Sequence, residues 1–285
     1  MAFFKGGILV MFEKENQSLQ IRNGYNFREL GGYFTMDGKK VKKHKLIRAG
    51  ALDKLAEDEL NFLQEYGVRY ILDFRTNSEI STKPDIIPND AITYRIPVFD
   101  EMPESNDTNI VKDAYEDSVS KVIMYFKNKP DNVGYSRMLS VYKKLVISSS
   151  AQRAYQQFFK LLLANDLDNQ ALLFHCSAGK DRTGFATYLI LSALGVSHKT
   201  IINDYLLTNQ FILKRVNSRI NKFYEAQANE NVIKNVRDRL TVHVAYLQSA
   251  INYINSQWGG INYYLREYLK VSDKNIASLR KIYLS

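Results

Sequence analysis

The sequence predicts an α/β fold in which helices flank a central, twisted and mostly parallel sheet. The run 68–74 is apolar almost throughout, as in a parallel strand that is covered on both faces. A second short apolar run, 171–174, leads through a loop into a helix at 182–194 that is apolar nearly all round and so belongs in the interior. The length of 285 residues allows one large core, and we expect a single domain over residues 1–285.

The first half of the chain contains further elements of this fold. Asp37-Gly38 favours a hairpin turn. Leucines at helical spacing predict a helix over 54–66. Thr76-x-x-Glu79 has the spacing of a helix capping box. Another strand is predicted over 94–99.

Residues 100–133 differ from the rest of the chain, because polar residues become frequent and the periodicity weakens. We expect an insertion of helices and loops there. Ligands bind at the carboxyl ends of parallel strands, so an insertion that follows a strand is placed to cover the site as a lid. Residues 1–20 are expected to form an N-terminal extension. Helical patterns resume over 135–163, with a break at 148–150, and the chain beyond 195 is mostly helical.

The composition narrows the function only coarsely. With 39 Lys and Arg against 30 Asp and Glu, the net charge is +9, which favours anionic partners such as phosphorylated proteins, phosphoinositides, membrane surfaces or nucleic acid. A merely soluble basic surface fits equally well. The single cysteine excludes an intramolecular disulfide. No signal peptide is recognised, and no stretch approaches the roughly 18 apolar residues of a membrane span, so we expect a cytoplasmic protein.

The chemistry is concentrated in the loop His175-Cys176-Ser177-Ala178-Gly179-Lys180-Asp181-Arg182-Thr183-Gly184. Five residues separate Cys176 from Arg182, so the loop can wrap with its backbone N–H groups pointing inward, as a nest for an oxyanion. The helix that begins near Arg182 adds the positive end of its dipole. Cys176 is therefore predicted to be a thiolate nucleophile at neutral pH. The planar guanidinium of Arg182 suits two phosphate oxygens.

The remaining loop residues are predicted to support this chemistry. Gly179 permits an unusual backbone angle, and Gly184 permits close packing of the helix. The Thr183 hydroxyl can hydrogen-bond the cysteine sulfur, and His175 orders the loop. The residues predicted to bind the phosphate beside Arg182 are Ser177, Ala178, Gly179, Lys180, Thr183 and Gly184. One Cys and four scattered His residues make no zinc cluster, and we expect neither a metal nor another cofactor.

The loop resembles the signature of the protein tyrosine phosphatase superfamily, and its Lys180-Asp181 version resembles a bacterial tyrosine phosphatase family with mycobacterial and Listeria members. The resemblance covers roughly residues 21–285, with no clear correspondence over 100–133. Its other matching segments are Asn26-Phe27-Arg28-Glu29-Leu30-Gly31-Gly32-Tyr33, Leu46-Ile47-Arg48-Ala49-Gly50-Ala51-Leu52, Asp73-Phe74-Arg75-Thr76, Asp204-Tyr205-Leu206-Leu207-Thr208-Asn209 and Tyr264-Leu265-Arg266.

This resemblance implies a protein tyrosine phosphatase-like fold and the hydrolysis of phosphotyrosine in proteins, with phosphoserine, phosphothreonine and phosphoinositides as further substrates. Lys180 fits that breadth, because it adds a second cation beside the bound phosphate. The implied partners are phosphorylated proteins and phosphoinositides rather than nucleic acid, with peripheral contact with an anionic membrane. Some relatives act outside the bacterium without an obvious signal, so secretion is an alternative to the cytoplasm.

The reaction needs a general acid to protonate the leaving oxygen, and three aspartates are candidates. Asp181, beside Arg182, is the first choice and is supported by the resemblance; a purely structural role is its alternative. Asp100 follows the strand predicted at 94–99, where related dual-specificity phosphatases carry their acid on a mobile loop. Asp73 ends another strand, and its alternative is an ion pair with a nearby arginine.

Other classes of protein also carry a cysteine loop. A catalytically dead phosphate-binding module is disfavoured by the intact Cys176 and Arg182. A rhodanese or an arsenate reductase is a further alternative, although arsenate reduction normally needs resolving cysteines that this chain lacks. Outside the loop, Arg28 and Arg48 are expected to be members of structural ion pairs.

Overall fold

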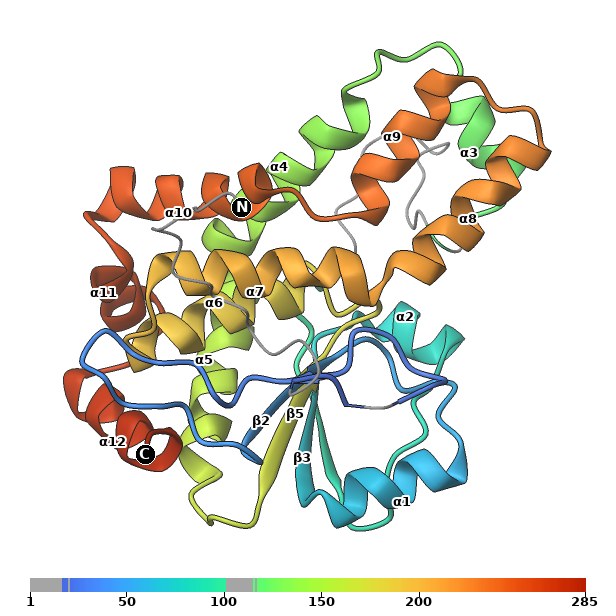
Figure 1. The fold of residues 1–285 in the computed structure, drawn as a ribbon. Helices are drawn as coiled ribbons and strands as arrows, with labels where there is room; N and C mark the ends of the chain where they lie inside the picture. Colours follow the sequence, from blue (N-terminus) through green and yellow to red (C-terminus); the bar gives the residue numbers. More distant parts are fainter. Residues whose placement is uncertain (1–16, 20, 101–114, 116) are drawn as a thin grey trace, which may run out of the picture.

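The computed structural model describes residues 17–19, 21–100, 115 and 117–285, and its centre is a five-stranded sheet (Figure 1). The strands are β1 (Arg28–Glu29), β2 (Leu46–Ala49), β3 (Val68–Asp73), β4 (Ile92–Arg95) and β5 (Ala171–His175). Their order in the sheet is β1-β2-β5-β3-β4. β1 pairs antiparallel with β2, and the other pairs are parallel. The predicted α/β fold with a mostly parallel sheet is confirmed.

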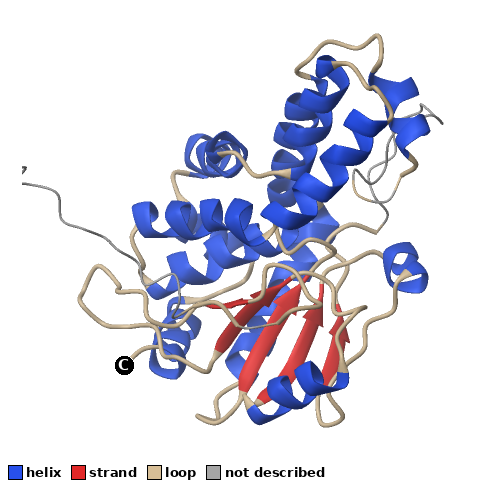
Figure 2. Ribbon diagram, turned by 45° about the vertical axis from the view of Figure 1, so that its right-hand side comes forward, coloured by secondary structure: helices blue, strands red, loops and turns tan. Residues whose placement is uncertain are grey.

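The two faces of the sheet pack against different helices. Side chains alternate between the faces along a strand, so Ile71 and Leu173 pack on the side of α1 (Glu57–Glu65), whereas Leu72 and Leu172 point into the larger core. Figure 2 shows the main group of helices gathered beside one face of the sheet. These helices are α4 (Val133–Ile147), α5 (Ser149–Ala164), α6 (Arg182–Leu194), α7 (His198–Phe211), α10 (Val244–Trp258), α11 (Ile261–Tyr263) with the π-helical turn Tyr264–Tyr268, and α12 (Asp273–Tyr283).

The element boundaries follow the local signals closely. α6 spans the predicted 182–194 and ends at Gly195, whose φ of 86° is the left-handed cap that glycine favours. The predicted break at 148–150 is Ser148, which ends α4 and caps the start of α5. The predicted strand 94–99 is wrong in its bounds. β4 spans Ile92–Arg95, although Ile96 N and Val98 N still donate to the carbonyl oxygens of Asp73 and Phe74, so the chain stays beside the end of β3 after the strand has ended.

A second, smaller core lies away from the sheet, at the top right of Figure 1. Here α3 (Val119–Phe126) packs with α8 (Leu213–Glu225) and α9 (Glu230–Leu240). The predicted insertion at 100–133 thus contributes α3 to a helical group whose other members come from much later in the chain. Residues 101–114 and 116 of that insertion lie outside the described part of the chain.

A buried cluster of charges joins the edge of the sheet to α7. Asp204 of α7 accepts from Arg28 Nε at 3.1 Å and from Arg48 Nη1 at 2.6 Å, and all three side chains are fully buried. The Tyr33 hydroxyl also donates to Asp204, at 3.0 Å. Burial by itself raises the pKa of Asp204, but the two arginines outweigh it and hold the pKa below its ordinary value. The expected ion-pair roles of Arg28 and Arg48 are confirmed.

Asp204→Asn should lower the free energy of unfolding by about 3 kcal/mol, because it leaves two buried guanidinium groups without their carboxylate. Urea denaturation at neutral pH measures the change. Since the folded-state pKa of Asp204 is depressed, its contribution is present above the unfolded pKa of about 3.9 and is lost as the pH falls through the folded value. Asp168→Asn is the control, because that carboxylate is 88% exposed beside Lys42 and should matter little. Equal stability of the two variants would contradict the prediction.

Candidate active site

The predicted catalytic loop lies at the carboxyl end of the central strand β5. β5 ends at His175, the loop follows, and α6 begins at Arg182. This edge of a parallel sheet is where ligands bind in α/β proteins. Cys176, the first loop residue after β5, is only 3% exposed.

The surroundings of Cys176 favour its ionised form. Burial raises the pKa of the Cys176 thiol, but the Arg182 guanidinium and the nearby hydroxyl and backbone N–H of Thr183 overcome that effect. The net result is a pKa below the ordinary value of a thiol. These contacts favour the thiolate, which is the nucleophilic form of cysteine.

Arg182 is held in place by Glu79 of α2 (Asn77–Thr82). Its Nη1 donates to Glu79 Oε2 at 2.6 Å and its Nη2 to Oε1 at 2.7 Å, a two-point contact that fixes the plane of the guanidinium. Ser177 Oγ donates to the same carboxylate at 2.5 Å. Burial raises the pKa of Glu79, but Arg182 and these hydrogen bonds bring it well below its ordinary range.

Glu79 also completes the predicted capping box. Its Oε2 accepts from Thr76 N at 2.8 Å, while Thr76 Oγ1 accepts from Glu79 N at 3.2 Å. The capping-box pattern explains a glutamate at this position by local structure alone, and it does not predict the second contact of Glu79, with Arg182. One carboxylate starts α2 and orients Arg182, which lies 103 residues further along the chain.

The middle of the loop is held by hydrogen bonds to the carbonyl oxygen of Gly179. Asn26 Nδ2 donates to this oxygen at 2.6 Å, and Arg48 Nη2 donates to it at 2.9 Å. The φ of Gly179 is 65°, as its predicted special backbone angle requires. A Cβ at this position would lie 2.4 Å from the Ala49 carbonyl oxygen. Arg48 thus connects the charge cluster around Asp204 to the catalytic loop.

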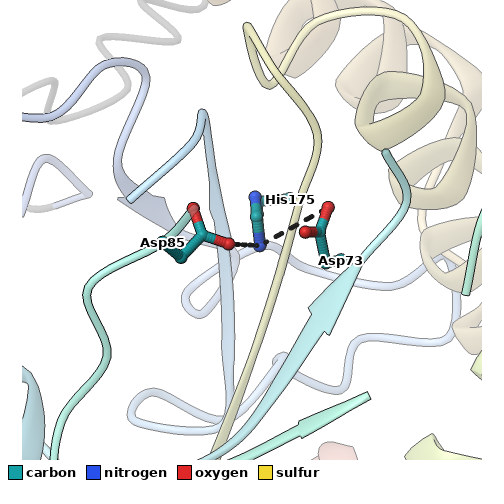
Figure 3. Close-up of side chains that lie close together, drawn as sticks. All are labelled: Asp73, Asp85 and His175. Atoms are coloured by element: carbon teal, nitrogen blue, oxygen red, sulfur yellow. Dashed lines mark ion pairs between the residues drawn. The ribbon is translucent and has the colours of Figure 1, made fainter. Parts of the chain in front are cut away.

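The base of the loop is held by a buried charged group around His175 (Figure 3). His175 Nε2 lies 3.3 Å from Asp85 Oδ2 and 3.9 Å from Asp73 Oδ1. Burial lowers the pKa of His175, but Asp73 and Asp85 outweigh it and raise the pKa above its ordinary value. The three potential ligand atoms lie within 4.8 Å of one another, as in a metal site. Arg75, however, donates to both carboxylates and already supplies a cation there.

Lys180 and Asp181 form the far side of the loop. Asp181 stands at the N-cap of α6 but makes no side-chain cap bond, so its carboxylate serves other partners. Lys180 Nζ lies 2.8 Å from Asp181 Oδ2, and the Tyr142 hydroxyl donates to Asp181 Oδ1 at 3.1 Å. Tyr142 is paired in turn with the Tyr205 hydroxyl at 2.7 Å.

Comparison with known proteins identifies the group to which this site belongs. The model of the tyrosine phosphatase family matches residues 19–285. The chain belongs to the tyrosine phosphatase family.

Named relatives agree with this assignment. A protein of Cupriavidus necator named as a tyrosine-protein phosphatase is 30% identical over 262 residues, which cover 91% of this chain and 86% of the relative. The triple specificity protein phosphatase PtpB of Mycobacterium tuberculosis is 24% identical over 284 residues, which cover 93% of this chain and 98% of the relative. A tyrosine-protein phosphatase of Nostoc commune is 26% identical over 168 residues, which cover 58% of this chain and 49% of the relative. The protein is thus a tyrosine phosphatase enzyme of the bacterial kind that the loop resembles.

The three candidate acids of this tyrosine phosphatase have different surroundings. Asp181 lies in the loop, with its side chain 20% exposed. Asp73 is bonded through both of its oxygens by Arg75, at distances of 2.7 to 3.0 Å, which is the ion pair that was its alternative. Asp100 is 79% exposed and lies 4.0 Å from Arg153.

Several supporting residues were not found from the sequence. Asp85, Asn26 and Tyr142 touch the loop or its base, and each comes from a distant part of the chain. Asn26 has a φ of 59°, and no residue pattern in the sequence predicts that angle. The close packing predicted at Gly184 is confirmed, because a Cβ there would lie 3.3 Å from the Tyr205 ring.

Thr183→Val should raise the pKa of the Cys176 thiol, because it removes a hydroxyl that helps to lower that pKa. The rate of alkylation by iodoacetamide as a function of pH gives the midpoint, which in the wild type should lie below the value of about 8.5 of a free thiol. Thr187→Val is the matched control. That hydroxyl lies one turn further along α6 and donates to the Thr183 carbonyl instead, so its loss should leave the midpoint unchanged. An unshifted midpoint in Thr183→Val would refute the assigned contact.

Proposed function

We propose that this tyrosine phosphatase hydrolyses phosphotyrosine monoesters through a phosphocysteine intermediate on Cys176. The observation that carries the proposal is the buried thiol whose pKa Arg182 and Thr183 lower. In the first step Sγ of Cys176 attacks phosphorus, the bond to the phenol oxygen breaks, and that oxygen takes a proton from Asp181. In the second step a water oxygen attacks phosphorus, the S–P bond breaks, and the proton of the water passes to Asp181. Inorganic phosphate leaves and the thiolate is restored.

The phosphate is bound by the loop 177–182 and by two cations. Arg182, oriented by Glu79, presents its planar guanidinium to the phosphate oxygens. Lys180 supplies the second positive charge, and its present partner is Asp181. When a phosphate draws Lys180 away, Asp181 loses a neighbouring cation and gains a neighbouring anion. The Asp181 carboxyl is then released from its ion pair with Lys180 and is available as the acid that the first step needs.

The substrate range extends in our proposal to phosphoserine and phosphothreonine. The relative from Mycobacterium tuberculosis, named a triple specificity protein phosphatase, supports this breadth. The physiological partners would be phosphorylated proteins of the cytoplasm. No helix in the part of the chain that the structure describes has both the length and the apolar character to cross a bilayer.

A second candidate substrate class is the phosphoinositides, hydrolysed at the same site. Lys180 favours it, because a second cation in the loop suits a headgroup with several negative charges. The net charge of +9 favours peripheral contact with an anionic membrane, where such lipids lie. Side-by-side kinetics with a phosphotyrosine peptide and with phosphoinositides rank the two classes.

Cys176→Ser should abolish turnover of an aryl phosphate, by about 10⁴-fold or more, because a hydroxyl is not ionised at neutral pH. The release of para-nitrophenol measures the rate, and circular dichroism checks that the variant is folded. The chain has one cysteine, so no other thiol can replace it. A folded serine variant that keeps most of its activity would exclude the phosphocysteine route.

Asp181→Asn should lower kcat by about 10²-fold for aryl phosphates with poor leaving groups and much less for good ones, because only poor leaving groups need the proton. A series of aryl phosphates whose leaving phenols have increasing pKa measures how kcat depends on the leaving group. Asp100→Asn is the matched comparison, since it tests the runner-up acid by the same change. If the steep dependence appears in the Asp100 variant instead, or in neither, Asp181 is not the acid.

A further inference from the structure

Two buried tyrosines form a hydrogen-bonded chain that ends on Asp181, and neither has a part in the two chemical steps above. The hydroxyl of Tyr142, on α4, donates to Asp181 Oδ1 at 3.1 Å. The hydroxyl of Tyr205, on α7, lies 2.7 Å from that of Tyr142. A hydroxyl has one proton to donate. Because the proton of Tyr142 points at the carboxylate, the Tyr205 hydroxyl is the donor in the second bond.

Packing fixes the positions of both rings. Tyr142 and Tyr205 are 0% and 1% exposed. Their rings meet edge to face with centroids 6.1 Å apart, and the centroid of the Tyr246 ring lies 6.0 Å from that of Tyr142. The Tyr205 ring also packs against the first turn of α6, where a Cβ on Gly184 would lie 3.3 Å from it. The Tyr142 hydroxyl is therefore a fixed point beside the loop, to which the carboxylate of Asp181 is attached.

Asp181 is positioned by side chains, because its carboxylate makes no cap bond to α6. Lys180 Nζ lies 2.8 Å from Asp181 Oδ2 and 3.1 Å from Oδ1. In the proposed reaction Lys180 turns to the phosphate, so it does not hold Asp181 while the proton is transferred. The hydrogen bond from Tyr142 remains at that moment, because Tyr142 is a neutral side chain that a phosphate does not attract.

We propose, on the basis of the acid role proposed for Asp181, that Tyr142 is the positioning residue of the general acid and that Tyr205 orients Tyr142. Since Oδ1 accepts from Tyr142, the acidic proton is carried on Oδ2, the oxygen beside the phosphate-binding Lys180. From there it passes to the leaving oxygen as the bond from that oxygen to phosphorus breaks. Tyr142 keeps its own proton throughout. Burial and the nearby Tyr205 and Asp181 raise the pKa of Tyr142 well above its ordinary value, which keeps it a donor at neutral pH.

Tyr142→Phe tests this role, because it removes the hydroxyl and keeps the ring. For aryl phosphates with poor leaving groups, kcat should fall about tenfold, since the acid is no longer held in line with the leaving oxygen. For the best leaving groups kcat should stay within about twofold of the wild type, because they leave without a proton. The pH midpoint of Cys176 alkylation should not move, which separates this effect from a general loosening of the loop.

The same substitution in the Asp181→Asn background separates positioning from a structural role. If Tyr142 acts through Asp181, the double variant should have a kcat within about twofold of Asp181→Asn alone. Tyr205→Phe is the second variant, and it keeps the test open if Tyr142→Phe does not fold. It leaves the bond from Tyr142 to Asp181 in place, so we expect a loss of about threefold with the same dependence on the leaving group.

Tyr264→Phe is the matched control. Tyr264 is also fully buried, and its hydroxyl donates to the Val146 carbonyl oxygen in α4 at 2.9 Å, so its loss should leave the leaving-group dependence unchanged. If Asp181→Asn shows the steep dependence, three results overturn the positioning role alone: no loss in Tyr142→Phe, an equal loss for all leaving groups, or the full further loss in the Asp181→Asn background. An Asp181→Asn enzyme without that dependence would instead defeat the proposed acid, and the role of Tyr142 with it.

Discussion

A thiolate buried under a phosphate site is stable only if positive charge and hydrogen-bond donors surround it. Cys176 is almost fully buried, and burial alone would keep its thiol neutral. Arg182 and Thr183 oppose that effect and bring the pKa of the thiol below its ordinary value, and both belong to the first turn of α6. The chain therefore has to hold one strand end, one loop and one helix start in a fixed relation. Three clusters of buried polar contacts serve that relation.

Three groups of buried charges fasten the loop from different directions. At its base, His175 lies between Asp73 and Asp85. At its middle, the Gly179 carbonyl accepts from Arg48, which is itself paired with Asp204. At its end, Arg182 is paired with Glu79. Each charged group in these clusters has an opposite charge within reach, as burial requires. The strand order β2-β5-β3 brings these segments to one edge of the sheet.

The sequence predicted those parts of the site that are contiguous in the chain. The run 171–194 contains the strand, the loop and the helix, and its local signals suffice for all three. Glu79 was recognised as a capping residue, but its contact with Arg182 depends on how β3 and β5 pair and has no local pattern. The contacts of Tyr142 and Asp85 with the loop and its base were not predicted, for the same reason. The small core of α3, α8 and α9 was also missed, because it joins segments that lie about 100 residues apart. Pairings over such distances are fixed by packing, which spacing alone does not encode.

The central claim is that Cys176 itself carries the phosphoryl group during turnover. Rapid quenching of the wild-type enzyme with an aryl phosphate, followed by proteolysis and mass spectrometry, tests this most directly. The phosphate should be found on the peptide that contains Cys176, and it should accumulate within the first turnover and disappear as substrate is used up. Turnover without phosphate on that peptide, or with phosphate on another residue, would contradict the claim.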